Sequence, residues 1–206
     1  MPSIELEKTE SEIVFIVEGK DDEIFLNSFI KKRITEDDSF QIVQLKGKKN
    51  LKQTLKDVSK IPGFRKVRRL AVIIDADNSC ENTFKSIKNA LSHTGFPKPE
   101  KLGEFTSDSE RKLSAAAYIM PNCCGEGELE DLLLSSIEDT QALNCIDSFW
   151  NCIGKERKTS KGSAQIYLAS REKFTSGIGA GVQRKYFILK SNKFSKLQTL
   201  LKQAFL

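Results

Sequence analysis

The sequence predicts an α/β fold in which a mainly parallel central sheet is flanked by helices and followed by a mostly helical C-terminal extension. Up to Pro121, short apolar runs alternate with segments in which apolar residues recur at helical spacing, a pattern typical of parallel sheets with crossover helices. The apolar residues at 70–74 are unbroken by any polar side chain, which indicates a strand buried on both faces. After Pro121 the apolar spacing is mostly helical.

Each element is predicted from its local pattern. Apolar runs bounded by polar or turn residues predict a short strand around Phe105 and longer strands at 12–17, 40–45, 67–74 and 115–120. Apolar residues three or four positions apart predict helices at 21–33, 50–61 and 81–91, and later ones starting at 125, 141, 160 and 193. We expect an α/β core over 10–122, with 123–206 packed on it as one compact unit.

Two local features carry predictions of their own. Asp21 or Asp22 is the expected N-cap of the first helix, because aspartate side chains accept hydrogen bonds from the free N–H groups of a helix start. The stretch 174–181 is rich in glycine. It predicts a flexible turn, with close approach to a nucleic acid as the alternative.

Composition places the chain among soluble globular proteins, since 39% of its 206 residues are hydrophobic and 30% are charged. No apolar run approaches the roughly 20 residues that span a bilayer, and the first residues lack the pattern of a secretory signal. We therefore expect a cytoplasmic protein with no membrane partner. Five cysteines without a C-x-x-C pair, and a single histidine, argue against a zinc site.

The net charge of +5 is unevenly distributed along the chain. Residues 154–206 include twelve lysines and arginines but only two acidic residues, whereas the N-terminal quarter has more acidic than basic residues. A basic C-terminal part combined with an acidic cluster suggests a polyanionic partner and a cation at the site. A solvated lysine-rich surface is the alternative explanation.

Acidic residues follow two of the predicted strands. Glu18 and Gly19 come after the first strand, and Asp75 and Asp77 come after the run at 70–74. Because parallel strands end at the same edge of a sheet, the three carboxylates would converge there if the two strands are neighbours. Converging carboxylates repel each other unless a cation lies between them, and oxygen ligands favour Mg²⁺ or Mn²⁺. The alternative is that the aspartates only shape a turn.

These motifs resemble those of the Toprim domain, whose family includes topoisomerase and primase catalytic domains, ribosomal-RNA maturases and OLD-type nucleases. The resemblance is carried by the glutamate–glycine motif at 18–22 and the Asp-x-Asp motif at 75–77, within a span of about 13–120. Segments 127–133 and 161–170 further resemble the acid-bearing and lysine-led helices of OLD-type proteins. The resemblance implies a small stand-alone relative without the ATPase half, because the chain has no G-x-x-x-x-G-K-[ST] loop.

The acidic candidates have defined expected roles. Glu18, Asp75 and Asp77 are the expected metal ligands and catalytic acids. Asp22 could reach the metal through water or only cap its helix. Glu130 could complete a second metal site or only stabilise the start of its helix.

The basic candidates are expected to contact phosphate. Lys161 is the catalytic candidate that could stabilise transition-state charge, with a surface lysine as the alternative. Four lysines are expected to hold a nucleic-acid backbone: Lys46, Lys48, Lys49 and Lys158. The alternative is that they are only solvated surface residues.

The leading functional hypothesis is a divalent-metal-dependent nuclease of the Toprim/OLD type that uses one or two Mg²⁺ or Mn²⁺ ions. Its expected partner is a nucleic acid, DNA rather than RNA, and a protein partner stays open. The alternative is a non-catalytic regulatory module that binds nucleic acid or protein on the same fold. Nucleotidyl transfer on RNA is a third option, for which the sequence has no independent nucleotide-binding signal.

Overall fold

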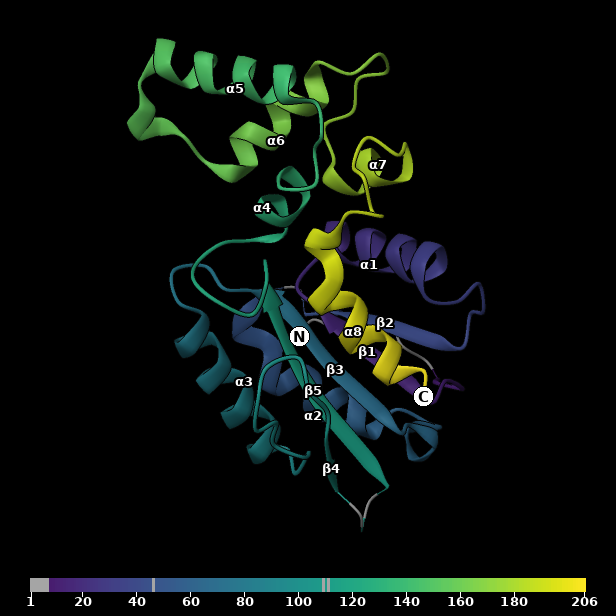
Figure 1. The fold of residues 1–206 in the computed structure, drawn as a ribbon. Coiled ribbons are helices and arrows are strands. Elements are labelled where there is room, and N and C mark those ends of the chain that lie inside the picture. Colours follow the sequence, from purple (N-terminus) through teal and green to yellow (C-terminus); the bar gives the residue numbers. More distant parts are fainter. Residues whose placement is uncertain (1–7, 46, 109, 111) are drawn as a thin grey trace.

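The computed structural model describes residues 8–206 apart from 46, 109 and 111, and the described part forms a five-stranded sheet in the order β2-β1-β3-β5-β4 (Figure 1). The strands are β1 (Ile13–Val17), β2 (Phe40–Gln44), β3 (Arg69–Asp75), β4 (Thr106–Asp108) and β5 (Leu113–Met120). Neighbouring strands are parallel except β4 and β5, which are antiparallel. The predicted α/β class with a mainly parallel sheet is confirmed.

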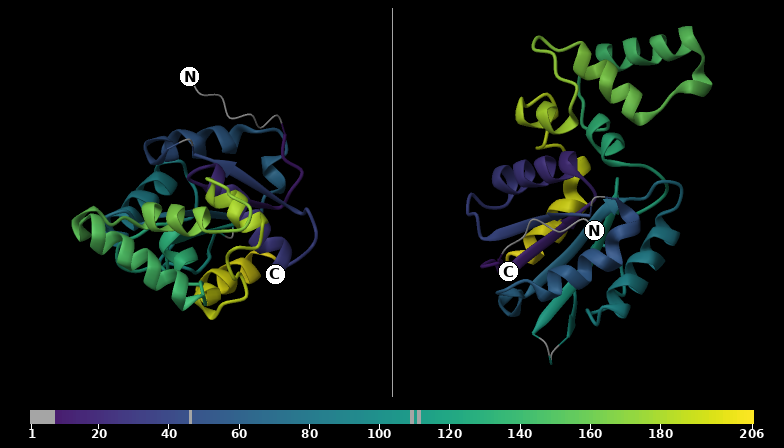
Figure 2. Two further views of the ribbon diagram at one scale, coloured as in Figure 1. Left: turned by 90° about the horizontal axis from the view of Figure 1, so that it is seen from above. Right: turned by 180° about the vertical axis from the view of Figure 1, so that it is seen from behind.

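Helices cover both faces of the sheet. Alternate residues of a strand point to opposite faces, and every residue of β1 and β5 is buried, so neither face is open to solvent along these strands. One apolar cluster contains Ile16 together with residues of α2 (Leu51–Lys60) and α3 (Cys80–His93). The other contains Phe15 together with residues of α1 (Lys20–Arg33) and α8 (Ser195–Ala204). Figure 1 and the right view of Figure 2, which is seen from behind, show α8 over one face and α2 over the other.

The first helix begins earlier than predicted. Its N-cap is Gly19, whereas Asp21 and Asp22 lie inside the first turn, so the predicted aspartate N-cap is wrong. Asp22 instead accepts a hydrogen bond from the Gly19 N–H at 3.0 Å. The carboxylate therefore satisfies a free donor at the helix start from a position three residues downstream, as in a capping box.

The chain after β5 is helical, as predicted. It forms α4 (Leu129–Leu134), α5 (Thr140–Ile153), α6 (Ser160–Ala169), α7 (Ile178–Gln183) and α8, with short 3₁₀ turns at Lys155–Arg157 and Asn192–Phe194. Two other 3₁₀ turns, Lys48–Asn50 and Phe64–Lys66, lie earlier in the chain. Helices α5 and α6 form an arm beyond the carboxyl ends of the strands (Figure 1). Trp150 Nε1 donates to Ser163 Oγ at 3.0 Å and joins the two helices. Within the described residues, no helix is long and apolar enough to cross a bilayer.

The glycine-rich stretch does not form the predicted flexible turn. It contains most of α7, whose buried residues include Gly179 and Gly181. The Gly179 N–H donates to Asp21 Oδ1 in α1 at 2.9 Å. Gly179 therefore allows α7 to pack closely on α1, because a side chain there would meet Asp21 and Ile24. A side chain at Gly181 would instead meet Leu168 of α6 and Phe187.

Candidate functional site

A cavity of about 330 Å³ lies at the carboxyl ends of β1 and β3. Four separate parts of the chain supply its walls: the start of α1, the end of β3, the start of α4 and the start of α6. The lining residues are Glu18, Gly19, Lys20, Asp21, Asp22, Asp75, Leu129, Glu130 and Lys161. Five of the residues singled out from the sequence therefore share one pocket: Glu18, Asp22, Asp75, Glu130 and Lys161.

The sheet topology brings the two acidic motifs together. Strands β1 and β3 are direct parallel neighbours, with Val17 paired to Ile73, so Glu18 and Asp75 follow at the same edge. The loop after β5 is bonded to the Asp-x-Asp motif, since Asp77 and Gly127 exchange backbone hydrogen bonds of 3.0 and 3.2 Å. This pairing positions the start of α4 beside the end of β3.

Asp75 is the most constrained carboxylate of the site. It is 9% exposed, and its Oδ1 accepts a hydrogen bond of 2.9 Å from the Leu129 N–H at the start of α4. Burial, together with the negative charges of Asp22 and Glu18, raises the pKa of Asp75 to about 8 against the opposing effect of Lys48. Ionisation of this carboxyl group is therefore unfavourable in the metal-free protein.

Two further carboxyl groups in the pocket have the same electrostatic problem. Burial, together with the charge of Glu18, raises the pKa of Asp22 to about 6. Burial likewise raises the pKa of Glu130 to about 7, with contributions from Glu128 and Asp22. Acidic groups crowded into a partly dry site favour either protonation or a bound cation.

Lys48 provides positive charge at the outer side of this group. Its Nζ lies 2.5 Å from Asp77 Oδ2 and 3.5 Å from Glu18 Oε2, and it donates to the Asp75 backbone oxygen at 2.8 Å. The ammonium of Lys48 therefore contacts both strand ends, and its predicted contact with phosphate stays a prediction. Asp77 adopts a left-handed backbone with φ of 52° and does not line the cavity that contains Asp75.

Lys161 provides positive charge on the opposite wall. Its Nζ lies 3.1 Å from Glu128 Oε2, and the hydrogen bond to Glu128 raises the pKa of Lys161, with further contributions from Glu130 and Asp75. Sequence reasoning missed Glu128. Its position directly before Leu129-Glu130-Asp131 was the available signal, because a residue at a helix start faces whatever binds there.

Two further candidate lysines, Lys49 and Lys158, do not line the cavity. Lys49 is exposed on the 3₁₀ turn after β2. Lys158 lies on the arm, where its Nζ is 2.6 Å from Asp147 Oδ1 of α5. Lys46 falls outside the described residues.

The donor atoms fit a hard divalent cation. Carboxylate oxygens dominate the pocket, and Mg²⁺ and Mn²⁺ prefer such ligands. Glu18 Oε2 is buried and has no hydrogen-bond partner, so it is an oxygen that a cation would satisfy. In the ranges covered by the structure, no three carboxylate, histidine or cysteine side chains are already arranged as a metal-binding group. The pocket therefore contains suitable ligands that would need to move to close on an ion.

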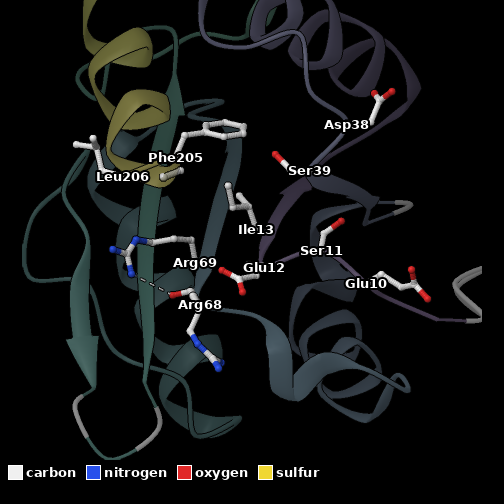
Figure 3. A pocket seen from close by; sticks show the side chains of 11 residues that line it. Glu10, Ser11, Glu12, Ile13, Asp38, Ser39, Arg68, Arg69, Phe205 and Leu206 are labelled. Carbon is white, nitrogen blue, oxygen red and sulfur yellow. Dashed lines mark hydrogen bonds between the residues drawn. The ribbon is translucent and has the colours of Figure 1, made fainter.

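A second and larger cavity, of about 590 Å³, lies at the opposite edge of the sheet (Figure 3). Its lining mixes Arg68, Arg69, Glu10 and Glu12 with apolar residues from the start of β1 and the C-terminus. Arg69 donates to the Arg68 oxygen at 3.4 Å and to Ser114 Oγ at 3.2 Å. Its guanidinium is therefore engaged within the fold, and this cavity shares no residue with the acidic pocket.

Comparison with known proteins identifies a family and two similar solved structures. A family model described as "Protein of unknown function (DUF3226)" matches residues 12–206. A hypothetical protein from Pyrococcus horikoshii OT3 has a similar solved structure, with 18% identity and a TM-score of 0.59, over 94% of this chain and 98% of its own. The C-terminal region of the Burkholderia pseudomallei OLD protein is similar over 96% of this chain and 100% of its own, with 11% identity and a TM-score of 0.49. No curated protein matches the chain.

Proposed function

Because this chain belongs to the DUF3226 family, whose function is unknown, we propose its function from the site: a divalent-metal-dependent nuclease that hydrolyses phosphodiester bonds. The observation that carries the proposal is one pocket that combines Glu18, Asp22, Asp75 and Glu130 with Lys161. Such a pocket can bind cations among its carboxylates and a phosphate beside its lysine. Phosphodiester hydrolysis requires both.

The residues divide into two groups by the chemistry that they offer. Glu18, Asp75 and Asp77 would hold a Mg²⁺ or Mn²⁺ ion, with Asp22 and Glu130 available for the same or a second ion. A bound divalent cation would activate water for attack and stabilise the leaving oxygen. Lys161 offers a protonated ammonium at the pocket wall, where it would neutralise negative charge that develops on the phosphate.

The sequence motifs support the same proposal. The acids at 18–22 and 75–77 resemble the two Toprim motifs, and 127–133 and 161–170 resemble the later segments of OLD-type nucleases. All four segments supply a residue to the pocket or to its immediate rim. The basic 154–206 segment adds the long-range attraction for a polyanion that a nucleic-acid substrate needs.

The direct test is cleavage of labelled DNA and RNA by the purified protein with Mg²⁺, with Mn²⁺ and with EDTA. We expect cleavage that needs the metal and falls by at least about 100-fold in Glu18→Gln and in Asp75→Asn, because each removes a charged metal ligand. Asp75→Asn keeps an oxygen for the Leu129 N–H, so the start of α4 is preserved. Glu81→Gln, an exposed acid in α3 that pairs with Lys85, is the control and should cleave normally. Equal activity in all three variants would contradict the assignment.

A non-catalytic binding module is the second candidate, and the contacts of Lys48 favour it. The ammonium partly compensates the charges of Glu18 and Asp77 without any metal. A module of this kind would bind nucleic acid equally well with Mn²⁺ or with EDTA and would leave it intact. The nuclease requires metal-dependent cleavage, so the same experiment separates the two candidates.

A further inference from the structure

Lys48 reaches the acidic edge from a third strand. It is the first residue of the 3₁₀ turn Lys48–Asn50 after β2, and β2 is the other parallel neighbour of β1. Its side chain is 23% exposed and contacts the ends of β1 and β3 through the carboxylates of Glu18 and Asp77 and the carbonyl oxygen of Asp75. A surface lysine of a solvated loop would extend into water instead.

The ammonium compensates the acidic edge only in part. At 3.5 Å it is too distant to hydrogen-bond well with Glu18, whose buried Oε2 has no hydrogen-bond partner. Besides Glu18 and Asp77, the neighbouring pocket contains the carboxyl groups of Asp22, Asp75 and Glu130. One positive charge at the outer side is therefore insufficient for the whole group, and a divalent ion would compensate it better.

We infer that Lys48 is a displaceable counter-cation, which balances Glu18 and Asp77 in the metal-free protein, yields this place to a divalent ion, and then contacts the substrate phosphate. The inference rests on the proposed function and adds to it the exchange of one cation for another. A divalent ion bound to Glu18 would repel the ammonium, whose Nζ lies 3.5 Å from Oε2 of the same carboxylate. The long flexible lysine stem allows that movement within the same edge of the sheet.

The inference predicts opposite effects of one substitution on two ligands. Removal of the Lys48 charge eliminates a competitor for Mn²⁺ and should strengthen metal binding. It also removes a phosphate contact and should weaken nucleic-acid binding. A purely structural lysine would instead weaken both, because its loss would disorder the site.

The experiment compares four proteins in two binding measurements. Binding of Mn²⁺ alone is measured by isothermal titration calorimetry, and binding of a fluorescent single-stranded DNA is measured by anisotropy with Ca²⁺ present. Compared with the wild type, Lys48→Gln should bind Mn²⁺ roughly three- to tenfold more tightly and DNA more weakly by a similar factor. Lys48→Arg keeps the charge and should stay close to the wild type. Lys52→Gln removes an exposed charge of the adjacent α2 helix and controls for net charge, with changes below about twofold.

The outcomes separate this inference from the proposed function. If Lys48→Gln binds Mn²⁺ no more tightly than Lys52→Gln, the displacement is refuted while the metal site stands. Unchanged DNA binding by Lys48→Gln would refute the phosphate contact. If none of the four proteins binds Mn²⁺, both the proposed function and the inference are wrong.

Discussion

The hydrogen bond of Asp75 and its proposed role as a metal ligand differ in the charge that they require. Its Oδ1 accepts the Leu129 N–H and so holds the start of α4, while burial and neighbouring acids raise its pKa to about 8. The hydrogen bond needs an acceptor oxygen but does not need a negative charge. Asparagine can therefore replace the aspartate in the fold, although it cannot replace it as a metal ligand.

This difference predicts a pH-dependent stability for the metal-free protein. The pKa of Asp75 is raised from 3.8 to about 8, so between these values the folded state binds more protons than the unfolded state. The free energy of unfolding must then fall as pH rises from about 4 to 8. Asp75→Asn should have a flatter profile and, at pH 8, exceed the wild type by about 1–3 kcal/mol.

Urea unfolding in EDTA at pH 5 and pH 8 measures this effect. Asp22 and Glu130, with pKa values of about 6 and 7, should keep part of the slope in the variant. Asp37→Asn, at an exposed position, is the control and should follow the wild-type profile. A wild type that is equally stable at both pH values would show that these carboxyl groups are ionised without penalty.

At the scale of elements, the position of α1 depends on contacts made at its N-terminal end. Gly19 caps the helix, and Asp21 accepts the Gly179 N–H of α7. A Cβ at Gly179 would lie 2.9 Å from Asp21 Oδ1 and 2.9 Å from Ile24 Cβ, closer than packed atoms tolerate. The contact between α1 and α7 therefore sets one wall of the acidic pocket.

Gly179→Ala should therefore destabilise the protein by about 1–3 kcal/mol, because overpacking outweighs the better helix propensity of alanine. Gly177→Ala is a matched control two residues away: its Cβ would lie 3.7 Å from the nearest atom, Asp21 Oδ1, an ordinary contact. Chemical denaturation of both variants tests the prediction. Equal stabilities would show that α7 can shift on α1 without cost.

Much of this arrangement could be predicted from the sequence, and the reasons are physical. Parallel strands end at one edge, so Glu18 and Asp75 could be assigned to the same edge of the sheet. Their closeness requires β1 and β3 to be neighbours, which the structure shows and the sequence pattern does not. The direction of Lys48 could not be predicted, because it depends on a 3₁₀ turn and on the charge of two distant segments. The role of Asp21 depends on its contact with Gly179, 158 residues later, and local propensity contains no signal for such a contact.

At the scale of the whole molecule, the sheet places its acids at one edge and the arm of α5 and α6 extends beyond that edge (Figure 1). Lys161 at the start of α6 joins the two, since it lines the acidic pocket while its helix belongs to the arm. A nucleic acid that follows the basic residues of the arm would therefore arrive at the carboxylates. This geometry connects the charge distribution of the chain to the chemistry proposed for the pocket.

The most direct test of the central claim is a crystal structure of the protein with Mn²⁺, in which anomalous scattering locates the ion. The account predicts a peak in the acidic pocket, about 2.0–2.6 Å from carboxylate oxygens of Glu18 and Asp75, with the Lys48 ammonium displaced from Asp77. The absence of a peak at saturating Mn²⁺, with Lys48 still bound to Asp77, would contradict it.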